Sequence, residues 1–183
     1  MKNIILFITL SALVTYSACA QKIYIGCPQQ VDTKPNAAFL NKQAVDLVIV
    51  DSRTIPPGAK IECQGSDIKQ VLEKFLRSEY PSCKITLLPD TLSAANHNGI
   101  KITIRITAYQ ASLSRSEWTG SVNYQVSIAD NRTQPAKKIA ETISNDTQRP
   151  GIIGYAAAKK CLFTSFGKSN QDLLAFIEGS LKD

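Results

Sequence analysis

Apolar and polar residues alternate along two long segments in the middle of the chain. In residues 100–107, isoleucine occupies every even position, and lysine, threonine or arginine every odd one. In residues 118–128, mainly apolar residues alternate with threonine, serine, asparagine or glutamine. A period of two places one set of side chains in the core and the other in water. The pattern predicts two strands that pair antiparallel.

Two further strands and a sheet edge are predicted around this pair. The run Val45-Asp-Leu-Val-Ile-Val50 is apolar and β-branched, and Pro56-Pro57-Gly58 interrupts the chain soon after it. It indicates a central strand buried on both faces. Residues 83–88 predict another strand. Residues 137–147 predict a weaker one, whose mixed and charged composition suits the edge of a sheet.

Two segments carry the helical period instead. Apolar residues recur three and four positions apart from Ile68 to Tyr80, with Ser66 as the expected cap, Phe75 in the centre of the stripe and Pro81 as the stop. A second apolar stripe covers residues 155–181. Gly167 lies within it and favours a bend or break there, because glycine weakens a helix interior. We expect an α+β fold with an antiparallel or mixed sheet of about five strands and two helices on one face.

The first twenty residues have the features of an export signal. Lys2 precedes an apolar stretch, residues 4–14, which is shorter than the roughly 20 residues that cross a bilayer. The sequence Ala18-Cys19-Ala20 fits the A-x-A cleavage pattern and predicts Gln21 as the mature N-terminus. We therefore expect a signal peptide over 1–20, an extended N-terminal segment over 21–44 and a single domain over 45–183.

Cys19 leaves a second hypothesis open. A lipoprotein peptidase would cleave before Cys19, and acylation of its thiol would anchor the protein in a membrane. Ser17 and Ala18 fit that pattern, whereas Tyr16 stands where an aliphatic residue is usual. The protein is accordingly expected to be periplasmic or extracellular, or else membrane-anchored through Cys19.

Four cysteines remain beyond the signal: Cys27, Cys63, Cys83 and Cys161. An even number in an exported chain predicts two structural disulfides, for which three pairings exist. Cys63 and Cys83 bracket a helix of about 15 residues whose ends lie over about 20 Å apart. This argues against a Cys63–Cys83 bond and leaves two pairings open, of which we favour Cys27–Cys63 with Cys83–Cys161. The spacings contain no C-x-x-C, which argues against a zinc site or a dithiol oxidoreductase.

The positive charge of the chain is scattered. The net charge is +6, and the densest clusters are the pairs Lys137-Lys138 and Lys159-Lys160. A nucleic-acid-binding protein would show a basic face or stripe. We expect no nucleic-acid partner.

No residue pattern spells out a catalytic site. His97 is the single histidine and stands in a polar Asn-His-Asn-Gly turn. Asp46 and Asp51 flank the buried strand and are the nearest approach to a carboxylate pair. Trp118 and Tyr124 share a strand face and are expected to be core. We predict no catalytic, metal-binding or cofactor-binding residues and no cofactor.

The order of elements resembles the YajG family of small envelope lipoproteins and, more distantly, the N-terminal domain of TolB and the curli-export lipoprotein. The resemblance covers residues 45–181. It rests on the strand ending Asp51-Ser-Arg53, the 71–76 helix, the 100–109 strand and the 172–177 segment. It implies an envelope protein. These families have no established catalytic residues, so the resemblance transfers no site.

The sequence favours an exported, non-enzymatic accessory or binding protein of the cell envelope. Its partner would be a protein or surface component, docked on an open edge or on the polar face of the 118–128 strand; a membrane would be bound only through acylated Cys19. One alternative is a small periplasmic hydrolase or lyase that uses Asp46, Asp51 or His97. Another is a secreted, disulfide-stabilised effector or inhibitor.

Overall fold

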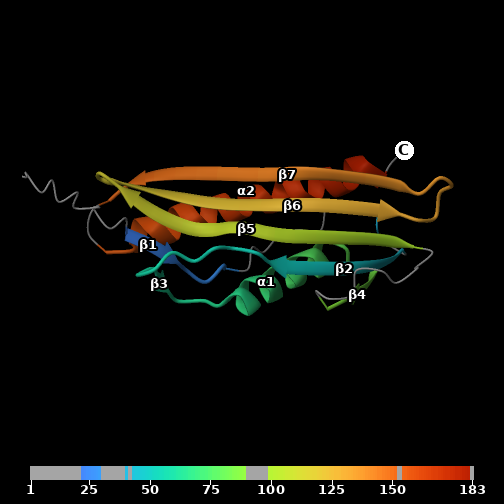
Figure 1. Ribbon diagram of the computed structural model, residues 1–183, viewed down its shortest axis with the longest axis horizontal. Coiled ribbons are helices and arrows are strands. Elements are labelled where there is room, and N and C mark those ends of the chain that lie inside the picture. Colours follow the sequence, from blue (N-terminus) through green and yellow to red (C-terminus); the bar gives the residue numbers. More distant parts are fainter. Residues whose placement is uncertain (1–21, 30–39, 41–42, 90–98, 152–153, 182–183) are drawn as a thin grey trace, which may run out of the picture.

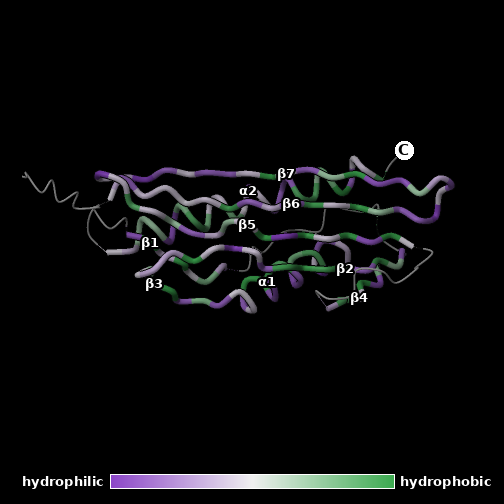
Figure 2. Tube along the Cα trace, viewed as in Figure 1, coloured by the Kyte–Doolittle hydropathy of each residue, from purple (hydrophilic) through white to green (hydrophobic). Residues whose placement is uncertain are grey.

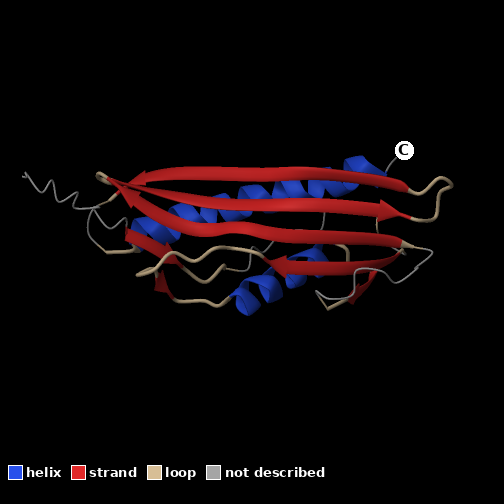
Figure 3. Cartoon of the chain, viewed as in Figure 1, coloured by secondary structure: helices blue, strands red, loops and turns tan. Residues whose placement is uncertain are grey.

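The computed structural model describes residues 22–29, 40, 43–89, 99–151 and 154–181. Over these residues, a mixed sheet of seven strands carries both helices on one face (Figures 1 and 3). The elements are β1 (Lys22–Ile25), β2 (Ala44–Asp51), β3 (Lys60–Ile61), α1 (Gly65–Glu79), β4 (Lys84–Leu87), β5 (Ile100–Ser114), β6 (Glu117–Asp130), β7 (Lys137–Pro150) and α2 (Ala156–Leu181). The α+β class is confirmed. The sheet is larger than the predicted five strands because β1 and the short β3 extend it.

The long strand β5 organises the sheet. One edge of β5 pairs antiparallel with β6, which in turn pairs antiparallel with β7. The other edge pairs first with β2, in parallel, and then with β1, antiparallel. The predicted pairing of the two alternating segments and the central position of β2, between β4 and β5, are therefore confirmed. Within the described chain β7 pairs only with β6, which confirms it as a sheet edge.

A bulge at Thr107 reverses the alternation along β5. Ile106 pairs with Tyr124 and Ala108 with Asn123, so Thr107 has no partner in the register. Before the bulge the even-numbered side chains are buried, and after it the odd-numbered Tyr109 and Ala111 are. A bulge inserts one residue on one strand and so shifts the facing of every later side chain. The strand consequently continues well beyond the 100–107 segment that alternation alone predicted.

The helix α1 begins two residues earlier than predicted. Its N-cap is Gln64 rather than Ser66, and the Gln64 backbone N–H donates to Asp67 Oδ2 at 2.9 Å. The helix ends at Glu79, with Tyr80 as its C-cap directly before Pro81, as predicted. Its buried side chains, Phe75 among them, join the core between the helix and β2.

The helix α2 is continuous, and the bend or break predicted near Gly167 is absent. Its middle is tied to β6 by buried hydrogen bonds (Figure 1 shows the helix running along the long strands). Ser165 Oγ donates to the Gly120 carbonyl at 2.7 Å, and Ser169 Oγ to the Val122 carbonyl at 3.0 Å. These contacts on either side of Gly167 hold the helix to the sheet. Among the described residues, no helix is long and apolar enough to cross a membrane.

One of the two predicted disulfides is present. Cys27 and Cys63 are joined and link the chain just after β1 to the chain just after β3. The predicted Cys83–Cys161 bond is wrong, because both thiols are free. The reason is the length of α2. Tyr80, close to Cys83 in the chain, lies beside Ile177 at the far end of α2, and Ile177 is sixteen residues, or about 24 Å, from Cys161.

Candidate functional site

The face of β5, β6 and β7 opposite the helices is built from short polar side chains. We call it the open face. Figure 2 shows that β7 is hydrophilic along most of its length, whereas β2 is largely hydrophobic. The register across the three strands brings the following side chains to the open face: Lys101, Thr103, Arg105, Ala108, Gln110 and Ser112 from β5, Thr119, Ser121, Asn123, Gln125, Ser127 and Ala129 from β6, and Lys138, Ala140, Thr142, Ser144, Asp146 and Gln148 from β7.

The middle of the open face carries hydroxyl and amide groups rather than charges. The five outward side chains of β6, from Thr119 to Ser127, are all neutral and extend over about 27 Å of strand. The charged groups lie on the neighbouring strands, where Arg105 Nη1 donates to Ser52 Oγ at 2.7 Å. Across to β7, Ser144 Oγ donates to Asn123 Oδ1 at 2.8 Å. The middle of the face thus offers many neutral hydrogen-bonding groups, with charged groups on the strands to either side.

A shallow hollow interrupts the open face. It has a volume of about 410 Å³ and lies where Thr103, Gln125 and Ser127 meet Ala140 and Thr142. Ala140 stands opposite Ser127 in the register, so two small side chains lie side by side there. A partner side chain could therefore insert at this point.

The two aspartates considered for catalysis do not come together. Asp46 and Asp51 are five positions apart on β2, and an odd separation places two side chains on opposite faces of a strand. Asp51 lies on the helix side, where its carboxylate approaches Gly65 at the start of α1. His97 lies outside the described residues. Among the described residues, no group of three His, Cys, Asp or Glu side chains could hold a metal ion.

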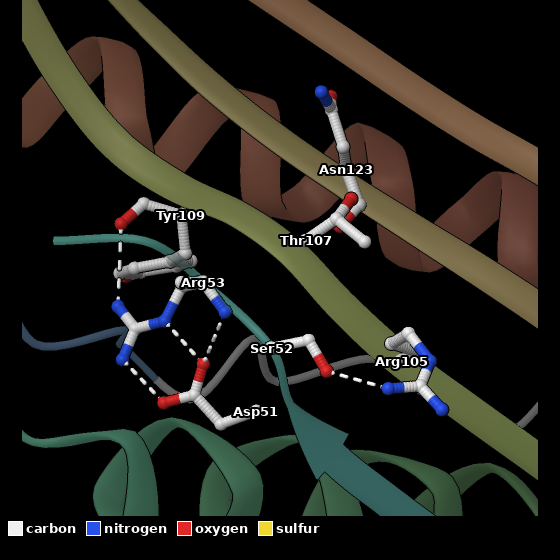
Figure 4. Close-up of polar contacts among 7 residues, drawn as sticks. All are labelled: Asp51, Ser52, Arg53, Arg105, Thr107, Tyr109 and Asn123. Atoms are coloured by element: carbon white, nitrogen blue, oxygen red, sulfur yellow. Dashed lines mark hydrogen bonds and ion pairs between the residues drawn. The ribbon is translucent and has the colours of Figure 1, made fainter.

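Asp51 and Arg53 form a bidentate ion pair (Figure 4). Arg53 Nε and Nη2 donate to the two carboxylate oxygens at 2.7 and 2.8 Å. Arg53 Nη1 also donates to the Tyr109 carbonyl at 3.4 Å, and the Arg53 side chain is only 3% exposed. The hydrogen bonds from Arg53 lower the pKa of Asp51 below its usual value. The pair fixes the chain after β2 against β5, and so the Asp-x-Arg sequence has a structural role here.

Stability should therefore depend on the charge of Asp51 at acid pH. Because the folded-state pKa is lowered, the contribution of the pair is complete at neutral pH and is lost as pH falls from the ordinary value of about 3.9 towards the folded one. Asp51→Asn should be less stable than the unsubstituted protein at pH 7, and the gap should narrow below about pH 4. Urea unfolding of both proteins at a series of pH values measures this. A gap that stays constant down to pH 2 would contradict it.

The aromatic residues of β6 are core, as predicted. Trp118 and Tyr124 are fully buried. The Tyr124 hydroxyl donates to Asn170 Oδ1 of α2 at 3.1 Å. They face the helices, and none of their surface contributes to the open face.

A pocket beside the disulfide was not predicted from the sequence. It lies between the chain following β1 and the first half of α2, and Tyr24, Glu62 and Lys159 are among its lining residues. The apolar run Ile23-Tyr24-Ile25 was the available signal for β1. Nothing in the sequence showed that Glu62, after β3, would lie beside Lys159, about a hundred residues later.

No family model matches the chain, and neither does any curated protein. Among solved structures, the hypothetical protein CT253 from Chlamydia trachomatis aligns with 12% identity and a TM-score of 0.49, over 77% of this chain and 98% of that one. The lipoprotein GNA1162 from Neisseria meningitidis aligns with 10% identity and a TM-score of 0.39, over 73% of this chain and 98% of that one.

A third solved structure is a Helicobacter pylori protein described as a homolog of a neuraminyllactose-binding hemagglutinin. It aligns with 10% identity and a TM-score of 0.39, over 87% of this chain and 92% of that one. These three neighbours are bacterial proteins, and one of them is a lipoprotein. The resemblance to the YajG family stays a prediction.

Proposed function

We propose that this chain is an exported, non-enzymatic binding protein of the cell envelope, which docks another envelope protein on its open face. The observation that carries the proposal is the run of neutral polar side chains along β6, flanked by polar positions of β5 and β7. The export signal expected over residues 1–20 supports the location, with Cys19 as the anchor where it is acylated.

The composition of the open face suits docking for two reasons. The centres of protein interfaces are depleted in charged residues, and the outward positions of β6 from Thr119 to Ser127 carry none. Serine and threonine side chains are short, so ordering them on binding costs less entropy than ordering lysine or arginine. The hollow around Ser127 and Ala140 adds a place for one anchoring side chain of the partner.

The docking proposal can be tested by photo-crosslinking in intact cells. A benzophenone amino acid is placed at Ser127, on the open face, and at the exposed Gln70 of α1 as the control. We expect a discrete adduct with one envelope protein from Ser127 and none from Gln70. Equal adducts from both positions, or none from Ser127, would contradict the proposal. An adduct with a glycan would also contradict it, because the partner would then be a carbohydrate and not a protein.

A matched pair of charge substitutions tests the chemistry of the face. Gln125→Glu places a carboxylate opposite Arg105 in the register, and Gln70→Glu places one four residues before Lys74 on α1. Each new charge has a positive neighbour, so neither should unfold the protein. Gln125→Glu should reduce the Ser127 adduct about tenfold, because a desolvated charge in an interface is costly. Gln70→Glu should leave the adduct unchanged.

A further inference from the structure

The pocket beside the Cys27–Cys63 disulfide has the size and lining of a small-molecule site. Its volume is about 390 Å³, within the roughly 300–1,000 Å³ typical of such sites. Tyr24 and Tyr109 lie at its floor and are buried, whereas Phe163 is 38% exposed. The pocket lies on the helix side of the sheet, away from the open face, so it is independent of the proposed docking surface.

The charged groups of the pocket leave one cation uncompensated. The Tyr24 hydroxyl donates to Glu62 Oε2 at 2.6 Å, and Lys159 Nζ lies 3.0 Å from the same oxygen. The hydrogen bond from Tyr24 and then the ammonium group of Lys159 lower the pKa of Glu62, so this carboxylate is charged at neutral pH. Lys160 also lines the pocket, and its ammonium group has no ion pair within the described chain.

The start of α2 supplies no carboxylate to balance these lysines. They follow three alanines, and the first turn of the helix carries no acidic residue. The charge of Lys160 is therefore free to act on a group bound in the pocket.

We propose that this pocket binds a small amphipathic anion, with an apolar or aromatic body against Phe163 above the tyrosine floor and the anionic group at Lys160. The Glu62–Lys159 pair closes one side of the pocket and leaves Lys160 as the charge that selects an anion. Phe163 is the apolar contact, which explains a large exposed aromatic on the outer side of α2.

Two fluorescent probes of similar shape separate the two parts of the proposal. Anilinonaphthalene sulfonate has an aromatic body with an anionic group, and N-phenylnaphthylamine has the aromatic body alone. We expect the full chain to bind the sulfonate more tightly. Lys160→Gln should weaken sulfonate binding about three- to fivefold, the size of an exposed ion pair, and leave the neutral probe unaffected. Phe163→Ala should weaken both probes.

Lys168→Gln is the matched control, because Lys168 is an exposed lysine of the same helix outside the pocket. It should change neither titration, and urea unfolding should confirm that all three variants are folded. The proposal is overturned if the sulfonate does not bind, if Lys160→Gln leaves its affinity unchanged, or if Lys168→Gln weakens it equally. If the probes do not bind as expected, the crosslinking result at Ser127 is unaffected. Likewise, a failure of the crosslinking experiment does not change the result of the probe titrations.

Discussion

Replacing Gly120 with valine is expected to destabilise the protein by about 3 kcal/mol, at the upper end of the cost of overpacking a core. A Cβ atom at Gly120 would lie 2.5 Å from the Leu162 backbone nitrogen and 2.6 Å from the Cys161 carbonyl carbon. The obstacle is the backbone of α2, which cannot rotate away as a side chain could. The hydrogen bond from Ser165 Oγ to the Gly120 carbonyl, at 2.7 Å, holds the helix at that distance.

Whether Gly120→Val stabilises or destabilises the protein shows which is larger, the steric clash with α2 or the strand propensity of valine. Valine favours strands and glycine weakens them, so propensity alone predicts that Gly120→Val stabilises β6. The control is Gly167→Ala in the interior of α2, where an added Cβ meets no atom within 4 Å. It should stabilise the protein by about 0.5–1 kcal/mol. Urea unfolding of both variants measures the two changes, and a neutral or stabilising Gly120→Val would show that α2 does not pack this closely.

Truncating Phe75 to alanine is expected to cost about 3–5 kcal/mol, a large part of the 5–15 kcal/mol typical of a domain. Phe75 lies on the buried face of α1 and is only 4% exposed. The sheet and the helix around it cannot collapse fully into the space that the ring leaves, so the loss of contacts adds to the loss of hydrophobic transfer energy.

Lys74→Ala provides the comparison for this change at the neighbouring position. Lys74 is exposed, and alanine is a good helix former, so the free energy of unfolding should change by no more than about 0.5 kcal/mol. Chemical denaturation followed by circular dichroism measures both variants. A cost below about 1.5 kcal/mol for Phe75→Ala would mean that the core around α1 relaxes into the cavity.

The docking and ligand proposals concern different sides of the molecule. The open face carries polar groups from three long strands and is neutral along the middle of β6, whereas the pocket combines a lysine of α2 with aromatic residues from β1, β5 and α2. A binding protein of the envelope could use both, with the small anion on the helix side and the protein partner on the sheet side. The crosslinking and probe experiments test them separately.

Local pattern was sufficient for most of the secondary structure. Alternation at residues 100–106 and 118–128 identified the strands that pair, since one side of this sheet packs against helices and the other is polar. The helical period located α1 and α2, and the charged composition of β7 indicated a sheet edge. The length of the helix between Cys63 and Cys83 argued against a bond between these two, and of the pairing that we favoured only Cys27–Cys63 is present.

Tertiary structure alone decided the features that depend on residues distant in sequence. The bulge at Thr107 lies where β5 passes from its pairing with β2 to its pairing with β1. A pattern with a fixed period of two could not predict the part of the strand beyond it. Cys83 and Cys161 are kept apart because α2 is continuous, a consequence of its packing on β6.

The candidate sites divide in the same way. The polar alternation of β6 was visible in the sequence because a strand places alternate residues on one face. The pocket was not visible in the sequence, because its lining residues Tyr24, Glu62 and Lys160 come from three separate segments. Local sequence determines which face of each strand or helix is buried, whereas chain folding determines which segments meet, and a binding pocket depends on the second.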